Sequence, residues 1–596
     1  MKNSINRKAT FILVLSFLLY NVSIYQITAA QSKKSSGDEA KWVERALKSL
    51  SLRERIGQMI VVYSSSEFAN FSSDRFADLQ RQITENKVGG VILSWGSANE
   101  VAAITNEMQR LAKIPLLISA DYERGLRMRL RSGTPFTTAM AVAASGDTNA
   151  AYTQGKIIAQ EMRAIGVNWL YAPVADINNN ADNPVINIRS FGEDPKRVGE
   201  LVAAFTRGVR DGGALSTAKH FPGHGDTATD SHIGLATLTV DRARLDSIEF
   251  VPFRAAINAG VDSIMVAHVA VPKVSGDEMP ATLSPKLTND LLRRDLNYQG
   301  IIVTDSLGMG AITKGFPNGA AAVQAIKAGA DVALMPPDPK AAIDAIEAAV
   351  KSGDLSEARI NESVQRILRA KYRLGLAKQR FVDLNAVNRI VEQKSNMLEA
   401  QRIAEMSITL PRNQGDMLPL SQERASRTLF IVLAADDDII EGQVLIPQIQ
   451  QRVRSAKILR LDSRTTAAEY AAALEEASRA ESIVIAPFVK RAANKGTVAL
   501  PEAQANFTKR LLESAKPVAV IAFGSPYLIR QFPAAPVYMV TYAIEEPAQY
   551  AAARALFGEI PITGRLPVSI PGIFELGAGL QIPARKAASA ETIRRF

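Results

Sequence analysis

Histidine is rare in this sequence, and most of it lies in one short segment. Three of the four histidines in 596 residues fall within Lys219–His232, which reads KHFPGHGDTATDSH. The unperturbed pKa of imidazole lies near neutrality, so histidine is the usual proton carrier at physiological pH. A metal site formed by His220, His224 and His232 is one interpretation, because histidines in a short span can form a ligand set; a solvated polar loop is another. We favour acid–base chemistry and substrate binding on a loop.

A carboxylate elsewhere in the chain could act together with this loop. Asp305 lies in Val303–Met309, VTDSLGM, where an apolar run ends and a glycine-containing turn follows. A carboxylate and a nearby proton donor are the minimum that cleavage of a glycosidic bond requires. The carboxylate would attack or stabilise the anomeric carbon, and His232 could protonate the leaving oxygen while Asp230 orients its ring. The alternative for Asp305 is a structural role, such as a helix N-cap.

Short apolar runs alternate with helix-length amphipathic segments from Leu52 onward. Repeated β-then-α units predict a parallel sheet, and eight of them predict a closed (β/α)8 barrel of the TIM type. An open, doubly wound sheet is the alternative, which periodicity alone does not exclude. The eight predicted strands are Ile60–Tyr63, Gly90–Ser94, Leu116–Ala120, Trp169–Tyr171, Ala214–Ala218, Ser263–Val266, Ile301–Thr304 and Val332–Met335.

Ionisable side chains follow five of these runs. In a parallel α/β barrel, the residues just past the carboxyl ends of the strands converge on one mouth, where the chemistry takes place. Core packing does not explain the pattern, because a buried unpaired charge is unfavourable. We therefore expect the barrel mouth to hold the residues that follow the runs, which are Asp121, Asp176, Lys219, His220, His268 and Asp305.

A second α/β region follows the barrel. Its apolar, β-branched runs alternate with helical segments, which predicts a smaller sheet layered by helices. These runs are Leu429–Ala434, Lys457–Leu461, Ser482–Phe488, Val518–Phe523 and Val537–Tyr542. The expected organisation is a signal peptide over 1–30, a polar linker over 31–44, the catalytic barrel over 45–376, a connecting segment over 377–400, the α/β-sandwich domain over 401–585 and a tail over 586–596.

The N-terminus and the composition predict location and partners. Lys2, Arg7 and Lys8 precede the mostly apolar stretch Phe11–Ile27, and small residues precede Gln31, which is typical of a secretory signal peptide. An uncleaved membrane anchor is the alternative. The absence of cysteine excludes disulfides and a thiol nucleophile. The net charge of +10 is not gathered in basic runs, so we expect no nucleic-acid partner. We expect a secreted or periplasmic protein without stable membrane association after signal cleavage.

Several motifs resemble those of glycoside hydrolase family 3, and in particular its β-N-acetylglucosaminidase branch. Lys219–His232 carries most of the resemblance, together with Asn187–Pro195 (NIRSFGEDP), and both Ala172–Asp176 (APVAD) and Thr304–Met309 (TDSLGM) agree with it. Leu556–Pro571 (LFGEIPITGRLPVSIP) resembles the end of the family's second domain. The resemblance implies a TIM-type barrel followed by an α/β-sandwich domain.

The resemblance also implies roles for individual residues. Asp305 matches the nucleophile, which forms a covalent glycosyl-enzyme intermediate with retention of configuration, and His232, paired with Asp230, matches the acid/base. His224 and Asp226 are expected to shape the loop. The positions that match the groups binding the hydroxyls and acetamido group of a terminal GlcNAc are Asp121, Arg129, Arg189, Lys219 and His220. The implied reaction releases terminal GlcNAc from a carbohydrate substrate, either peptidoglycan fragments or chitooligosaccharides, with no cofactor and no metal.

The segment after the third strand departs from the family pattern. The family usually reads D-Q-E-G-G-R-V-x-R there, whereas Asp121–Arg129 reads DYERGLRMR, with Arg124 and Leu126 in the places of a glycine and an arginine. Within the family, β-glucosidase and β-GlcNAc phosphorylase remain alternative activities, the second because a neutral imidazole would not repel phosphate as a carboxylate would. A non-catalytic glycan-binding protein is the alternative from another class.

Overall fold

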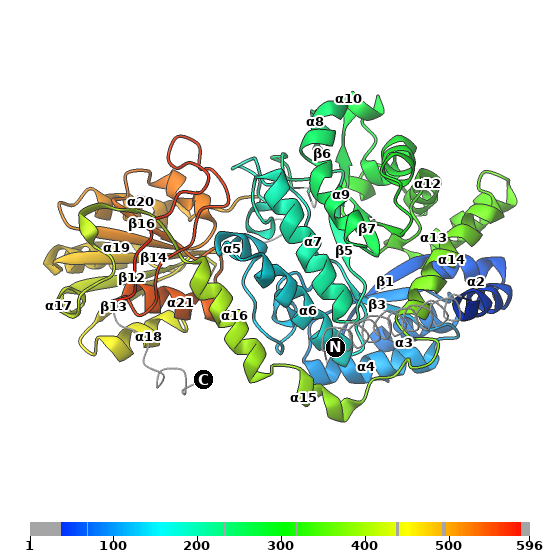
Figure 1. Cartoon of the computed structure of the whole chain (residues 1–596), viewed down its shortest axis with the longest axis horizontal. Helices are drawn as coiled ribbons and strands as arrows, with labels where there is room; N and C mark the ends of the chain where they lie inside the picture. The colour runs from blue at the N-terminus through cyan, green and yellow to red at the C-terminus, as the bar shows by residue number, and fades with distance from the viewer. Residues whose placement is uncertain are drawn as a thin grey trace, which may run out of the picture.

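The structure is a computed structural model that describes residues 37–67, 70–230, 233–317, 319–436, 440–490 and 496–585. The signal peptide expected over 1–30, the tail expected over 586–596 and His232 lie outside the described residues. The barrel (blue to green) and the second α/β domain (yellow to red) lie side by side in Figure 1, and helix α16 (Lys394–Ser407) runs from one to the other.

Eight parallel strands of the described chain form a closed ring, and the predicted barrel is confirmed. One sheet has the strand order β10-β1-β2-β3-β4 and another has the order β5-β7-β9. Parallel bridges between Trp169 and Leu215 and between Val303 and Val332 join the two sheets on either side. The barrel strands are β1 (Ile60–Ser65), β2 (Gly90–Ser94), β3 (Leu117–Ala120), β4 (Trp169–Leu170), β5 (Thr217–Phe221), β7 (Ser263–Val266), β9 (Ile301–Thr304) and β10 (Ala333–Leu334).

Helices connect the barrel strands and pack around them. Helix α7 shows why these segments are helical: Asp194 caps its first turn by accepting a hydrogen bond from the Arg197 amide, Pro195 occupies the first turn, and one apolar face is buried. The helices around the barrel are α2 (Leu52–Gln58), α3 (Asp74–Thr84), α4 (Ala98–Leu111), α5 (Ala139–Ala144), α6 (Thr148–Ala164), α7 (Pro195–Asp211), α8 (Arg242–Ser247), α9 (Phe250–Asn258), α10 (Pro272–Ser275), the π-helix η4 (Lys286–Asp295), α11 (Gly310–Thr313), α12 (Ala320–Ala328), α13 (Pro339–Lys351) and α14 (Glu357–Arg373). A short parallel pair, β6 (Ala236–Thr237) and β8 (Val269–Ala270), extends two of the loops.

The polar linker expected over 31–44 is wrong from residue 37 onward. Residues 37–48 form a helix instead. Val43 and Ala46 are buried in the barrel core together with Leu50, and the Trp42 ring lies 5.9 Å from that of Tyr372 on α14. The apolar residues recur at helical spacing behind a polar start, so packing against the barrel determines this helix.

The second domain is built on a six-stranded sheet in the order β11-β16-β15-β14-β12-β13, counted over the described residues. All neighbouring pairs are parallel except β11 with β16. Its strands are β11 (Thr409–Asn413), β12 (Thr428–Ala434), β13 (Lys457–Leu461), β14 (Ser482–Val489), β15 (Val518–Gly524) and β16 (Val537–Val540). The five predicted strands are present, and β11 is an addition. It contains Pro411, and its pairing register shifts between Thr409 and Arg412, so no regular strand pattern marks it in the sequence.

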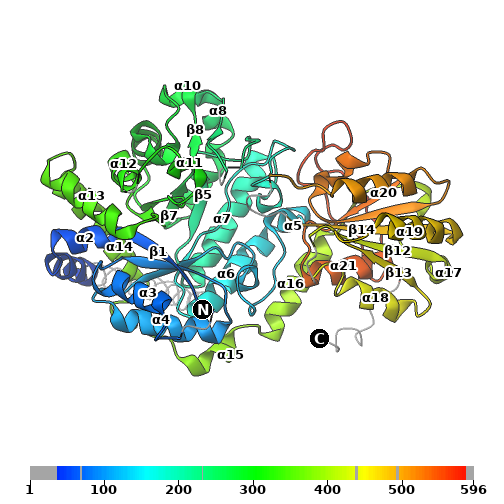
Figure 2. The same ribbon diagram turned by 180° about the vertical axis from the view of Figure 1, so that it is seen from behind.

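Helices cover both faces of this sheet, so the predicted sandwich is confirmed. Alternate residues of β12 enter two separate cores: Leu429, Ile431 and Leu433 face one, and Phe430 and Val432 face the other. Figure 2 shows α20 on one side of the sheet and α18 and α21 on the other. The helices of this domain are α17 (Gln422–Ser426), α18 (Leu445–Arg452), α19 (Ala467–Arg479), α20 (Glu502–Leu512), the 3-10 helix η7 (Pro526–Gln531) and α21 (Glu546–Leu556).

The two domains share an interface that belongs partly to the second domain's core. Met140, Ala141 and Ala144 of α5 pack into the apolar cluster on the α19 and α20 side of the sheet. The segment between the domains contains η5 (Leu384–Ala386) and α15 (Val387–Ile390), and α16 continues past the boundary expected at residue 400. None of the helices in the described part of the chain is long and apolar enough to span a bilayer.

Candidate active site

Side chains from several strand ends meet at one cavity of about 520 Å³ at the mouth of the barrel. Asp121 follows β3, Lys219 and His220 belong to β5, and Asp305 follows β9. Arg129 and Arg189 reach the same cavity from the loops after β3 and β4. The structure therefore brings together six of the eight site residues expected from the sequence. Asp230 is not among the residues that line this cavity, and His232 lies outside the described residues.

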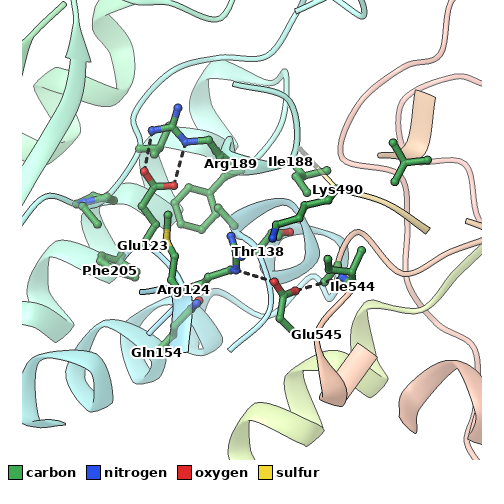
Figure 3. A pocket seen from close by; sticks show the side chains of 18 residues that line it. Glu123, Arg124, Thr138, Gln154, Ile188, Arg189, Phe205, Lys490, Ile544 and Glu545 are labelled. Carbon is green, nitrogen blue, oxygen red and sulfur yellow. Dashed lines mark hydrogen bonds and ion pairs between the residues drawn. The ribbon is translucent and has the colours of Figure 1, made fainter. Parts of the chain in front are cut away.

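Charged groups of alternating sign form the floor of the cavity. The Lys219 ammonium lies 2.8 Å from a carboxylate oxygen of Asp121 and 2.8 Å from one of Glu123. Arg189 donates two hydrogen bonds to Glu123, from Nε to Oε2 at 3.0 Å and from Nη2 to Oε1 at 2.7 Å, as Figure 3 shows. A guanidinium nitrogen of Arg129 lies 3.9 Å from the second oxygen of Asp121. This network holds four side chains in fixed positions around Glu123.

Burial makes the Glu123 contacts strong. Burial by itself raises the pKa of Glu123, but the neighbouring charges of Arg189 and Lys219 outweigh it and hold the pKa well below the usual range. Burial likewise acts to lower the pKa of Arg189, and Glu123 reverses the effect, so that the pKa is raised. Glu123 and Arg189 therefore stay charged in a site that excludes most water, where charge-assisted hydrogen bonds are strongest.

His220 is locked between a carboxylate and a guanidinium. Its Nδ1 lies 2.7 Å from Oδ2 of Asp176, and its Nε2 lies 3.3 Å from Nη2 of Arg189. A guanidinium can only donate, so Nε2 accepts and the ring proton resides on Nδ1, which donates to Asp176. Burial raises the pKa of Asp176, but the hydrogen bonds donated by the His220 ring and by the His224 amide help to lower it overall. Asp176 therefore sets the tautomer and the orientation of the His220 ring.

A break in the strand pattern lets two consecutive residues serve the same cavity. Neighbouring residues of a regular strand point to opposite faces. Lys219 and His220 nevertheless both line the cavity, because the pairing of β5 with β7 shifts register between Lys219 and Phe221. Irregularities of this kind redirect side chains near functional sites.

Asp305 is held by its own turn. Its Oδ1 accepts a hydrogen bond from the Ser306 amide at 2.7 Å, and its amide donates to the Val266 carbonyl at 2.9 Å. His268, left without a role at the sequence level, holds this turn in place: its Nε2 lies 2.8 Å from the Ser306 carbonyl oxygen, and its Nδ1 lies 2.8 Å from the Thr282 hydroxyl. A carbonyl oxygen only accepts, so Nε2 of His268 donates. We infer that His268 positions Asp305 rather than contacting substrate.

The histidine-containing loop is held by hydrogen bonds on both sides of its undescribed residues. The His224 amide donates to Asp176 at 2.7 Å, and its Nδ1 lies 2.7 Å from the Thr227 hydroxyl. Burial lowers the pKa of His224 to about 4, so its ring is neutral. Beyond His232, the Ile233 carbonyl accepts a hydrogen bond from Lys314, nine residues after Asp305, at 2.7 Å. Among the described residues no group of three or more metal-ligating side chains is placed to hold an ion.

The second domain also lines the cavity. It contributes Ile440, Lys490, Ile544, Glu545 and Glu546. The segment that departs from the family pattern makes the contact: Arg124 lies 2.8 Å from Glu545, and Arg127 lies 3.0 Å from Glu546. Figure 3 shows Arg124 reaching Glu545 beside a smaller cavity of about 50 Å³, which both domains line. Leu126, which replaces the family's arginine, is fully buried. In this segment Leu126 is therefore an apolar anchor, and Arg124 and Arg127 form ion pairs between the domains.

The sequence assigned no role to two carboxylates at the centre of the site. Glu123 was within the quoted motif but was given no role, and Asp176 was noted only as a residue at a strand end. The sequence does carry a signal for Glu123. Two cations expected at a buried position, Arg189 and Lys219, require carboxylate partners, because a buried unpaired charge is unfavourable. Asp121 alone could not pair with both.

Comparison with known proteins agrees with the two-domain architecture. The Glycosyl hydrolase family 3 N terminal domain matches residues 51–370, and the Glycosyl hydrolase family 3 C-terminal domain matches residues 408–589. The chain is 32% identical over 404 residues to the beta-N-acetylglucosaminidase/beta-glucosidase of Cellulomonas fimi, which covers 66% of this chain and 70% of that protein. It is 32% identical over 336 residues to the beta-hexosaminidase LpqI of Mycobacterium bovis, which covers 54% of this chain and 83% of that protein.

Solved structures resemble it over most of its length. A glycoside hydrolase family 3 beta-N-acetylglucosaminidase from Paenibacillus sp. superposes with a TM-score of 0.78 and 34% identity, over 87% of this chain and 99% of that one. The beta-glucoside phosphorylase BglX superposes with a TM-score of 0.81 and 26% identity, over 89% and 96% of the two chains. With both domains of the family matched in order along the sequence, this chain belongs to glycosyl hydrolase family 3.

Proposed function

We propose that this protein is an exo-acting, retaining β-N-acetylglucosaminidase that releases terminal GlcNAc from peptidoglycan fragments or chitooligosaccharides. The observation that carries the proposal is the convergence of Asp305 with the charged floor around Glu123 in one cavity at the barrel mouth. The cavity of about 520 Å³ accommodates one or two sugar rings, and its floor is closed by buried side chains. Relatives whose names give the same activity support the choice of GlcNAc.

The mechanism follows from the chemistry of two groups. In the first step, a carboxylate oxygen of Asp305 attacks C1 of the terminal sugar as the glycosidic bond breaks, and His232 gives its proton to the leaving oxygen. In the second step, His232 takes a proton from water, whose oxygen attacks C1 and displaces Asp305. Two inversions give net retention. Asp230, two residues before His232, is proposed to orient that ring.

The floor groups are proposed to hold the terminal sugar. Asp121 and Lys219 offer an acceptor and a donor 2.8 Å apart, a geometry that suits two neighbouring hydroxyls. Arg189 and Arg129 add donors for hydroxyl or acetamido oxygens. These groups are already held by one another, so they need little rearrangement when charge develops at the sugar.

Product analysis tests the proposal. Wild-type protein is incubated with chitobiose and with a muropeptide disaccharide, with and without phosphate, and products are separated by mass. We expect GlcNAc, and Asp305→Asn should lower its release at least 10³-fold, the scale at which loss of a nucleophile is felt. His232→Ala should spare p-nitrophenyl β-GlcNAc more than chitobiose, because nitrophenolate leaves without a proton. Unchanged activity in Asp305→Asn would refute the mechanism, and GlcNAc-1-phosphate as the main product would make the protein a phosphorylase.

A further inference from the structure

An exposed tryptophan lies at the rim of the active-site cavity and has no role in the mechanism above. Trp95 follows β2 and lines the cavity that also contains Asp305, yet 53% of its surface is exposed. The protein has three tryptophans; Trp169 is fully buried, and Trp42 is half-buried. A large apolar ring left open at the edge of a cavity marks a place where a ligand can cover it.

The backbone at Trp95 holds the ring there. Its φ is 66°, in the left-handed region that bulky residues rarely adopt. The Trp95 amide donates to the Arg129 carbonyl at 3.2 Å, and the Ser66 hydroxyl donates to the Trp95 carbonyl at 2.5 Å. The Arg131 amide donates to the Gly96 carbonyl at 2.9 Å. Contacts from the loops after β1 and β3 therefore fix an unfavourable conformation, which is typical of functional sites.

The position of Trp95 fits the leaving group rather than the terminal sugar. Lys219 and Arg189, which are proposed to hold the terminal sugar, lie deep, with side chains only 2% and 12% exposed, whereas Trp95 is at the mouth. From β9, which precedes Asp305, the ring of strands continues through β10 and β1 to β2, which precedes Trp95. The two residues therefore approach the cavity from nearly opposite sides. In a displacement by Asp305, the leaving group departs from the face of the sugar opposite the attacking carboxylate.

We propose that Trp95 is the stacking platform of a leaving-group subsite for a β-linked pyranose, the second sugar of the substrate. This inference rests on the proposed function. The axial C–H bonds of a β-linked pyranose present a flat apolar face that matches an indole ring. The rim beside it is polar, with Arg131 paired to Glu67 at 3.2 Å and to Glu100 at 2.9 Å. It can therefore meet the hydroxyls at the edge of the stacked ring.

A neighbouring cavity is the competing location. It measures about 670 Å³, contains the exposed ring of Tyr63, and adjoins the first cavity at Ser306 and Met335. It lies on the Asp305 side of the mouth, next to Ser306. Tyr63→Ala is therefore the variant that separates the two locations. Phe381→Ala is the matched control, because Phe381 is 44% exposed and lines a cavity beside Gly166 and Gly212, at the opposite end of the barrel.

Kinetics with two leaving groups test the subsite. The substrates are chitobiose, whose leaving group is a sugar ring, and trifluoroethyl β-GlcNAc, whose leaving group has no ring. We expect Trp95→Ala to lower kcat/KM for chitobiose about tenfold, the scale of a single aromatic stacking contact, and less than twofold for the trifluoroethyl substrate. Trp95→Phe should keep most of the activity, and Phe381→Ala all of it. Equal losses on both substrates, or a loss on chitobiose in Tyr63→Ala alone, would overturn the assignment.

A binding measurement separates this inference from the proposed function. Tryptophan fluorescence of the Asp305→Asn protein is followed while chitobiose or GlcNAc is added. We expect chitobiose to shift the emission to shorter wavelength as Trp95 is covered, GlcNAc to give a smaller response, and Trp95→Phe to abolish the difference. Identical responses to the two sugars refute the subsite, whether or not the wild-type protein hydrolyses either. Absence of GlcNAc release by the wild-type protein would refute the proposed function alone.

Discussion

Glu123 is the residue on which the floor of the active site depends, and Glu123→Gln is the most informative single change. The substitution keeps the size of the side chain but removes its charge and replaces one acceptor oxygen with a donor. Two contacts from Arg189 at 2.7 and 3.0 Å and one from Lys219 at 2.8 Å converge on the two oxygens. In at least one of these contacts, the amide N–H of the new glutamine faces an N–H donor of Arg189 or Lys219. The two buried cations also lose their common partner.

The size of the effect follows from burial. The side chains of Glu123 and Arg189 are 11% and 12% exposed and that of Lys219 is 2% exposed. Removing one partner from a buried pair destabilises a protein by about 3–5 kcal/mol. At roughly 2 °C per kcal/mol for a domain of this size, Tm should fall by about 6–10 °C. Displacement of Lys219 and Arg189 from the sugar should also lower kcat/KM about 100-fold, as expected for a shift near 1 Å.

A matched control separates stability from catalysis. Asp331 is fully buried and paired to Arg293 at 2.7 Å and to Arg366 at 3.1 Å, but it lies just before β10, at the end of the barrel away from the mouth. Asp331→Asn should lower Tm by a similar amount and leave kcat/KM near the wild-type value at 25 °C. The assays are calorimetry and hydrolysis of p-nitrophenyl β-GlcNAc. Activity of Glu123→Gln within threefold of wild type, or equal kinetic losses in both variants, would refute the role assigned to Glu123.

Two further predictions, which use three substitutions, test other parts of the structure. His224 is buried, and its pKa is lowered to about 4. Its contribution to the free energy of unfolding is therefore complete above the ordinary pKa of about 6.5. As the pH falls towards 4, about 3 kcal/mol of that free energy is lost. Between pH 6.5 and 4.5, the Tm measured by thermal unfolding should therefore fall less for His224→Asn than for the wild type. Parallel plots of Tm against pH for the two proteins would contradict this. Arg124→Gln and Glu545→Gln should each raise KM a few-fold, and a double-mutant cycle should give a coupling of about 1 kcal/mol or less that salt weakens; zero coupling at low salt would rule out a bond between the domains.

Much of the architecture could be predicted because it depends on local patterns. Each barrel strand is a short apolar run between amphipathic helices, and α7 begins at Pro195 and ends at Asp211 as its capping and periodicity predict. The sheet of the second domain follows the same logic, except for β11. That strand is an antiparallel edge strand held by its pairing with β16, and a partner distant in sequence is not a local signal.

The polar linker expected over 31–44 is wrong from residue 37 onward for a related reason. Six of the twelve residues over 37–48 are charged, and the apolar side chains between them, Trp42, Val43 and Ala46 among them, provide a face. That face becomes favourable only when the barrel is present to bury it, because short helices are marginal in water.

The sequence by itself determined the family, the order of the two domains and the candidate chemistry, since a cluster of histidines and a carboxylate at a strand end can be read without a fold. Only the tertiary structure decided which charges meet. Arg189 and Lys219 are far from Glu123 in the chain, and it is the closed ring that places both cations against its carboxylate. The register shift in β5 that turns both Lys219 and His220 to the cavity depends on its pairing with β7, and the contact of Arg124 with Glu545 joins residues of different domains. Periodicity describes one segment at a time, and a buried charge network is a property of many segments at once.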